Sequence, residues 1–445
     1  MYFFETTFQD VTRKFIMGLI FLNLSQSFGS DANLGSESAS LESLIQMALD
    51  HNPEIRSSRA DVQSQDAKIG PAGSYEDPML SVQALNVPVK SLRLDQDEMS
   101  GIQVGLTQKI PFPGKRTNER EISELKSSAA KNRLAQKQLD IVRDVKKVYY
   151  DLYLKNQHKL ILTQQRSFLK QLLAASRNQY ALNKISQAVV LNLQVDEASL
   201  IDEELKIESD IYDSLAELSH LVGHEKHFFS ASLEKHPLTK VNLDLWSEEK
   251  IAASVERNSF ELMALTSESE AGQMGVSLAK KGYLPDFEIS ANYIFRKPLE
   301  GMPTSATGNR DMVGGGIAVS LPLWAGSKQS ELIKGASADQ AKAQALLDNA
   351  RLMLTHQARA LFSQLKESKK RIELFEGGLL QLTAQAVGSG KSSYLTGRIE
   401  HAAFLESLKR QQNTQFSYQE ALVKFEIQLA SLEALMAKPL GSELR

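Results

Sequence analysis

The sequence of 445 residues contains no cysteine at all. The chain can therefore form neither disulfides nor thiolate metal sites, and this composition suits a compartment in which free thiols would oxidise. The net charge is only −3, so no basic surface indicates a nucleic-acid partner. No apolar run approaches the roughly 20 residues that a membrane-spanning helix needs.

Signatures of catalysis are also missing. The sequence has no G-x-S-x-G, no phosphate-binding loop, no H-E-x-x-H and no cysteine nucleophile. The glycines at Gly314–Gly316 lie inside a predicted strand, where small residues suit a crowded wall. We therefore predict that the protein is not an enzyme, and no cofactor or metal site is expected.

Residues 1–30 have the features of a signal peptide. Arg13 and Lys14 precede the apolar run Phe15–Leu24, and small residues suited to cleavage follow at 27–32. A run of about ten apolar residues is too short to span a bilayer as a permanent helix. An uncleaved anchor or an ordinary core segment is the alternative. Because no cysteine follows the run, a bacterial lipoprotein anchor is excluded.

The chain contains two diverged copies of one sequence unit. The matching positions are Asn52 with Asn258, Pro78 with Pro285, Ile110–Lys115 with Leu321–Lys328, and Tyr180–Leu191 with Tyr394–Leu405. The offset between the copies rises slowly along the chain, as small insertions would cause. Repetition on this scale predicts a structure built from equivalent units around an axis. We assign residues 31–240 to the first copy and 241–445 to the second.

Four segments alternate between apolar and polar residues with the period of a β-strand. They are Met79–Asn86, Ile102–Ile110, Asp286–Phe295 and Val313–Leu321. Ile102, Val104 and Leu106, for example, fall on one face of their strand. Each segment is close to the ~9–11 residues that a tilted membrane strand needs. In isolation these strands would also fit a small soluble sheet with one buried face.

Long helices are predicted after each pair of strands. The stretch Lys115–Gln179 contains no proline and no glycine, and at ~1.5 Å per residue it could extend for about 100 Å as one helix. Its apolar residues alternate in steps of four and three, as at Ile141, Val145, Val148 and Leu152, which is typical of a coiled coil. We therefore predict long antiparallel helices that pack side by side.

The number of strands predicts the oligomer. Four strands cannot close a barrel, and an open sheet with an apolar outer face would leave unpaired edges in lipid. Two copies would give eight strands, and such a barrel fills with its own side chains. Three copies give twelve strands and leave a lumen. The sequence therefore predicts a homotrimer.

In their order and duplication, these motifs resemble the TolC-like outer membrane efflux family. The resemblance covers about Leu41 to Leu440 and rests on the AL-x-x-NP-x-I opening at Ala48–Ile55, the strand prolines Pro78 and Pro285, the corners Pro111–Gly114 and Pro322–Gly326, and the paired Y-x-x-[NG]-[KR]-I turns. It implies a mostly α fold with a small β part, whose trimer forms a 12-stranded barrel in the outer membrane of a Gram-negative bacterium. The barrel would continue into an α-helical tunnel through the periplasm. This tunnel would be a passive exit duct for solutes that an inner-membrane pump delivers through a periplasmic adaptor.

The branch within this family is less well defined by the sequence. Thr107–Arg116 resembles the corner of relatives that work with heavy-metal cation pumps of the resistance-nodulation-division type. The eight histidines are scattered, although a passive tunnel need not coordinate what it passes. Drug efflux and type I secretion stay open, as does a soluble periplasmic coiled-coil scaffold or adaptor.

Two turns, Tyr180–Leu191 and Tyr394–Leu405, break the coiled coils. Asparagine and glycine tolerate positive φ, which suits Asn183 and Gly397 to the turns. We expect the turns at the periplasm-facing end, where the tunnel meets its adaptor. The candidate adaptor contacts are Asn183, Lys184, Ile185, Gly397, Arg398 and Ile399. The alternative is that these are ordinary helix-hairpin residues.

The family resemblance also implies a pore constriction near the second turn. Relatives often place acids six and nine residues after the turn glycine, and here these positions hold Ala403 and Glu406. A threefold ring of Glu406, with Glu400 beside it, would attract cations. A solvated, outward-facing glutamate is the alternative. Because the first copy has Asn192 where the second has Glu406, we expect gating to reside in the differences between the tips.

The two polar segments between paired strands, Val87–Gly101 and Arg296–Asp311, are predicted to be extracellular loops. In membrane barrels the long hairpin loops face outside the cell. The opposite strand ends lead into helices, which fixes the orientation.

Overall fold

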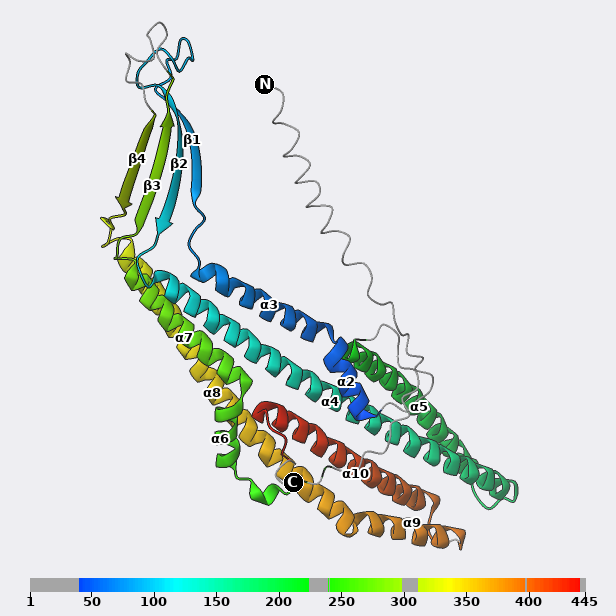
Figure 1. The fold of residues 1–445 in the computed structure, drawn as a ribbon. Helices are drawn as coiled ribbons and strands as arrows, with labels where there is room; N and C mark the ends of the chain where they lie inside the picture. Colours follow the sequence, from blue (N-terminus) through cyan, green and yellow to red (C-terminus); the bar gives the residue numbers. More distant parts are fainter. Residues whose placement is uncertain (1–39, 224–238, 240, 298–310, 397, 441–445) are drawn as a thin grey trace. The chain divides into compact units, whose positions relative to one another are not determined.

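The computed structural model describes residues 40–223, 239, 241–297, 311–396 and 398–440. Two runs of elements follow the same order there: two helices, two strands and a long helical hairpin (Figure 1). The first run comprises α2 (Leu41–His51), α3 (Pro53–Gly73), β1 (Met79–Leu85), β2 (Gly101–Ile110), α4 (Lys115–Ala181) and α5 (Gln187–Val222). The second comprises η1 (Leu243–Leu245), α6 (Glu248–Asn258), α7 (Phe260–Lys281), β3 (Phe287–Phe295), β4 (Met312–Val319), α8 (Gln329–Leu374), η2 (Phe375–Leu379), α9 (Leu380–Leu395) and α10 (His401–Met436). The predicted signal peptide, residues 298–310 of the second strand loop and Gly397 lie outside the described residues.

The four strands form one antiparallel sheet in the order β1-β2-β3-β4. Each lies within two residues of the ends expected from the alternating pattern. The strands β1 and β4 are the edges of the sheet in the described chain, and each has a hydrogen-bonded neighbour on one side.

The helix α4 runs without a break for 67 residues, as the absence of proline and glycine predicts. The predicted seam residues Ile141, Val145, Val148 and Leu152 are all buried. In the second hairpin Phe425 of α10 is buried in the same way, within a large apolar core shared with α8. The coiled-coil packing of these helices therefore follows from their apolar periodicity.

The helix equivalent to α4 is interrupted. The elements α8, η2 and α9 span 46, 5 and 16 residues, and η2 is a π-helix in which Gly378 has φ 144°. A π-helix adds one residue to a turn. Our expectation that the buried seam continues to Leu382 is wrong, because this side chain is exposed beyond the π-helix.

The buried positions of the two copies show where this residue is inserted. Before η2 the copies match at an offset of 213 residues, as in Tyr149 with Phe362, Leu152 with Leu365 and Leu162 with Phe375. Beyond η2 the offset is 214, as in Leu169 with Thr383 and Tyr180 with Tyr394. The π-helix is thus a one-residue insertion in the second copy only.

Two rows of helices follow from the packing contacts. Nearer the sheet the order is α3, α4, α7, α8, and toward the hairpin turns it is α5, α4, α10, α8 with α9. The helix α4 belongs to both rows because of its length (Figure 1). Within the described residues, no helix combines the length and the hydropathy that a bilayer span requires.

Candidate functional site

One face of the sheet is apolar. Directly opposed residues form rows across all four strands: Val82, Val104, Tyr293 and Val313 in one, and Leu80, Leu106, Ala291 and Gly315 in the next. The large side chains Leu80, Val82, Leu106 and Val313 are exposed in the single chain. A contiguous apolar face of this kind is a surface that must be covered by lipid or protein.

The opposite face carries small and polar residues. Ser81, Gly105, Asn292 and Gly314 form a row on this side. A Cβ atom on Gly314 would come within 2.5 Å of Asn292 Oδ1, and one on Gly105 within 2.9 Å of Ser81 Oγ. The glycines therefore make room for polar side chains of the neighbouring strands, which gives the sheet one hydrophilic face.

The corner between β2 and α4 is locked to the corner between α7 and β3. Asp286 Oδ1 accepts hydrogen bonds from the Phe112 N–H at 2.8 Å and from Lys115 Nζ at 2.7 Å. Gly114 has φ 90°, and its carbonyl accepts from Lys281 Nζ at 2.9 Å. The predicted strand-to-helix corner is thus a joint that fixes the sheet to the long helices.

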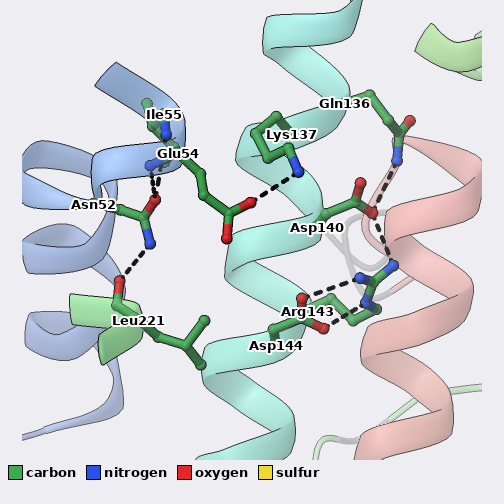
Figure 2. A network of polar contacts seen from close by, with 9 residues as sticks. All are labelled: Asn52, Glu54, Ile55, Gln136, Lys137, Asp140, Arg143, Asp144 and Leu221. Carbon is green, nitrogen blue, oxygen red and sulfur yellow. Dashed lines mark hydrogen bonds and ion pairs between the residues drawn. The ribbon is translucent and has the colours of Figure 1, made fainter. Parts of the chain in front are cut away.

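The Asn-Pro motif of the first copy joins three helices (Figure 2). Asn52 Oδ1 accepts from the N–H groups of Glu54 and Ile55, which caps α3. Its Nδ2 donates to the Leu221 carbonyl near the end of α5 at 2.8 Å. Our match of Asn52 with Asn258 needs a correction, because the cap of α7 is Ser259 and Asn258 ends α6.

A network of charges lies beside this cap on α4 (Figure 2). Lys137 donates to Glu54 at 3.0 Å, and Arg143 contacts Asp140 at 2.8 Å and Asp144 at 2.9 Å. Burial alone would lower the pKa of Arg143, but the hydrogen bonds and charges of Asp144 and Asp140 raise it. This network joins α3 to α4 and is structural.

The two hairpin turns have the same backbone geometry at an offset of 214 residues. Leu182 and Thr396, which follow the last helical residues, have φ, ψ of −90°, 9° and −90°, 3°. The N–H groups of Lys184 and Arg398 each donate to the carbonyl five residues earlier, at 2.9 and 2.8 Å. Asn183 has φ 55°, as expected for this turn.

The predicted adaptor residues of the described chain lie at these turns. Asn183, Lys184 and Arg398 are exposed, whereas Ile185 and Ile399 are half-buried. Ile185 packs against the apolar core of the first hairpin. The residues therefore divide into exposed polar groups and isoleucines that anchor the turns.

An aromatic cluster that the sequence analysis missed holds the two turns together. The Phe404 ring is buried, stacks on Tyr394 at 5.5 Å and meets Phe168 of α4 edge-on at 5.8 Å. Tyr394 and Leu405 also pack against the core of the first hairpin. The alignment of the turns gave a signal for this cluster, because Phe404 occupies the position of the apolar Val190.

The two predicted acids lie on the first turns of α10. Glu400 is its exposed N-cap residue, and its side chain makes no capping bond. Glu406 is also exposed, and its carboxylate lies 3.7 Å from Arg410, one turn further along. Arg410 therefore compensates part of the charge of Glu406 in the single chain. Within the described residues, no three acidic or histidine side chains gather as a metal site.

A buried carboxylate was also missed. Glu426 of α10 is 6% exposed and accepts from Tyr150 Oη at 3.2 Å, the Thr239 N–H at 2.6 Å and Thr239 Oγ1 at 2.8 Å. Burial and the neighbouring Glu426 raise the pKa of Tyr150. Since the partners lie 187 and 276 residues away in sequence, no local pattern could have indicated this site.

Comparison with solved structures places this fold among outer membrane channels. The chain is similar to the outer-membrane channel OprN (14% identity, 90% of each chain covered, TM-score 0.77) and to CusC (13% identity, 93% of this chain and 99% of that chain, TM-score 0.73). It is also similar to the outer membrane protein VceC from Vibrio cholerae (20% identity, 90% of this chain and 96% of that chain, TM-score 0.72). At these identities the likeness establishes the fold.

The sequence itself matches the outer membrane efflux protein family over residues 44–224 and 252–438. A comparison with curated proteins gave no match. The two matched segments coincide with the two runs of helices and strands described above. Because the match covers most of the chain, the chain belongs to the outer membrane efflux protein family and is an outer membrane channel of an efflux system.

Proposed function

We propose that three copies of this chain close a 12-stranded barrel, in which β4 of one copy pairs with β1 of the next. The observation that carries this proposal is the exposed apolar face of a sheet that ends in two edge strands. In a membrane, every strand must be paired, because an unpaired backbone group in hydrocarbon costs several kcal/mol. Twelve strands satisfy both edges and leave a lumen.

In this arrangement the apolar face contacts outer membrane lipid and the polar face lines the lumen. The row of Ser81, Gly105, Asn292 and Gly314 is the hydrophilic wall that such a lumen needs. The small size of these residues also keeps the passage wide. The strand loops, of which Val87–Gly101 lies within the described residues, then face the cell exterior.

The hairpin turns form the end that meets the periplasmic adaptor. The exposed Asn183, Lys184 and Arg398 supply polar contacts, and the half-buried Ile185 and Ile399 keep the turns rigid. Gly397 completes the second turn in the sequence. The common geometry of the two turns supports this role, because a trimer would present six similar tips to a ring of adaptors.

Glu406, with Glu400 six residues before it, forms the constriction at the same end. In a trimer, three exposed Glu406 side chains at one level would favour cations. The nearby Arg410 limits this preference. The gate is therefore weakly charged in the single chain, and its strength depends on how Glu406 and Arg410 divide in the assembly.

Members of this family work with a periplasmic adaptor and an inner-membrane pump. For this chain we propose a pump of the resistance-nodulation-division type and heavy-metal cations as the first solutes to test, with drug efflux and type I secretion as the other candidates. The duct itself is passive. The family match weighs against the alternative of a soluble scaffold or adaptor.

Membrane fractionation and planar-bilayer recording test the assembly. The protein should fractionate with the outer membrane, run as a trimer after amine cross-linking, and conduct ions in a bilayer. A chain that is released by osmotic shock and stays monomeric would refute the proposal. A chain that forms trimers in the membrane without conductance would refute the duct.

A further inference from the structure

The helices α5 and α9 lie at opposite ends of one row. Among the described elements, α5 packs mainly against α4, α4 packs against α10, and α10 packs against α8 and α9. The two hairpins of the chain therefore meet through a seam between α4 and α10. The outer flank of α5 and that of α8–α9 belong to no such seam in the single chain.

The duplication gives each of these helices a counterpart. The counterpart of α4 is α8–α9, at an offset of 213 residues before η2 and 214 beyond it, and the counterpart of α10 is α5, at an offset of 214. The equivalent of the α4–α10 seam would therefore join α8–α9 to α5. In one chain these elements stand at the two ends of the row, so only a second copy can complete it.

Equivalent residues differ in exposure in the way that this reasoning predicts. On α4, Ile161 and Phe168 are half-buried against the second hairpin. Their counterparts Leu374 and Leu382 are 65% and 63% exposed. The same apolar positions are therefore covered in the first copy and uncovered in the second.

The other side of the seam shows the same contrast. Leu405 of α10 is half-buried and Glu426 is almost fully buried. Their counterparts on α5, Leu191 and Tyr212, are 50% and 63% exposed. Exposed leucines on both unpartnered flanks are unusual for helices that end in water, and they need a cover.

We propose that α8–α9 of one copy packs along α5 of the next copy, as α4 packs along α10 within a copy. This inference rests on the trimer proposed above and names the helical faces that join its subunits. Continuity supports it, because the helices at one end of each row follow β1 and those at the other end follow β4, the two strands that would pair between copies.

The contacts of the internal seam predict those of the external one. His158 with Phe416, Phe168 with Phe404, and Tyr150 with Glu426 become Arg371 with Asp202, Leu382 with Val190, and Ser363 with Tyr212 of the next copy. The predicted pairs are one of opposite charge, one apolar and one of two hydroxyls. Each is chemically matched, although the residues differ from those of the internal seam.

Cysteine cross-linking tests this seam without background, because the chain has no cysteine. The double variant Arg371→Cys/Asp202→Cys should give covalent dimers and trimers with a short bis-thiol reagent, and each single variant should give almost none. The matched control is His158→Cys/Phe416→Cys, whose ring centroids lie 4.3 Å apart within one chain. It should react without any increase in mass.

The outcomes separate the seam from the trimer itself. If amine cross-linking gives trimers but the Arg371→Cys/Asp202→Cys pair gives no ladder, the seam is wrong and the trimer stands. If neither reagent gives a trimer, the proposed assembly fails as well. A ladder from the control pair would mean that α4 and α10 meet between chains, which also overturns the seam.

Charge reversal provides a second test that needs no cross-linker. Arg371→Glu and Asp202→Arg should each lower the trimer fraction in detergent several-fold, because like charges would face each other. The double reversal should restore most of it. Equal loss in the double and single variants, with helical content unchanged by circular dichroism, would contradict the pairing.

Discussion

Gly223 and Ala437 hold the same backbone position in the two copies, 214 residues apart. Each follows a long helix and adopts the left-handed conformation, with φ 73° at Gly223 and 49° at Ala437. This conformation costs a residue with a Cβ atom roughly 1–2 kcal/mol, and glycine adopts it without strain. The second copy therefore carries a strained helix end where the first does not.

Ala437→Gly should stabilise the protein by up to about 1 kcal/mol, since relief of strain outweighs the greater entropy of glycine in the unfolded chain. Gly223→Ala should destabilise it by about 2 kcal/mol or more, because the new Cβ would lie 2.6 Å from the His51 carbonyl oxygen. Thermal unfolding in detergent, followed by circular dichroism, measures both. A lower midpoint for Ala437→Gly would contradict the argument.

The cap at Asn52 predicts a second pair of effects. Asn52→Ala removes the cap of α3 and leaves the buried Leu221 carbonyl without its donor, which together should cost about 2–3 kcal/mol. Its sequence counterpart gives the control: Asn258 donates only to Ser254, so Asn258→Ala should change stability by less than about 0.5 kcal/mol. Equal midpoints for the two variants would show that the clamp contributes nothing.

The sequence predicted the elements of this fold because they depend on local patterns. Alternation located the strands, and the absence of proline and glycine over Lys115–Gln179 located α4. The turn of Asn183 followed from its tolerance of positive φ. These features need no knowledge of residues that are distant in the chain.

What the sequence did not predict depends on distant partners or on one inserted residue. Glu426 is buried by Tyr150 and Thr239, which no local pattern places beside it. The π-helix is a one-residue shift in phase, and the apolar residues before and after it still resemble one seam. Leu382 was therefore assigned to the buried face, although it lies on the exposed one.

The π-helix predicts a third effect, on assembly. Deletion of Gly377 would restore a regular helix and rotate α9 by about 100° relative to α8, since a helix has 3.6 residues per turn. Leu382 and the second turn would then leave their frame, and the trimer fraction in detergent should fall. The control Gly335→Ala lies in α8 with open space around it and should leave assembly intact. A deletion variant that forms normal trimers would show that the inserted residue has no role.

The joint at Asp286 predicts a fourth. Asp286→Ala removes the acceptor of the Phe112 N–H and of Lys115, whose side chain is largely buried, and should destabilise the protein by about 1.5–3 kcal/mol. Glu76→Ala breaks an exposed ion pair with Lys109 and should cost less than about 1 kcal/mol. Urea resistance of the detergent-solubilised protein compares the two. A cost for Glu76→Ala that equals that of Asp286→Ala would mean that burial of Lys115 does not matter.

The pair of Glu406 and Arg410 predicts opposite effects on conduction. In water two unit charges about 4 Å apart interact by about 1 kcal/mol, so removal of one partner should change the cation preference by up to roughly fivefold. Glu406→Ala should lower the ratio of cation to anion permeability, and Arg410→Ala should raise it. Reversal potentials in a salt gradient across a planar bilayer measure this ratio. Both shifts should shrink between about 0.1 M and 1 M salt, because the screening length falls from about 10 Å to about 3 Å. Unchanged reversal potentials in both variants at low salt would place Glu406 outside the conducting path, and shifts of the same sign would show that the two charges do not face one lumen.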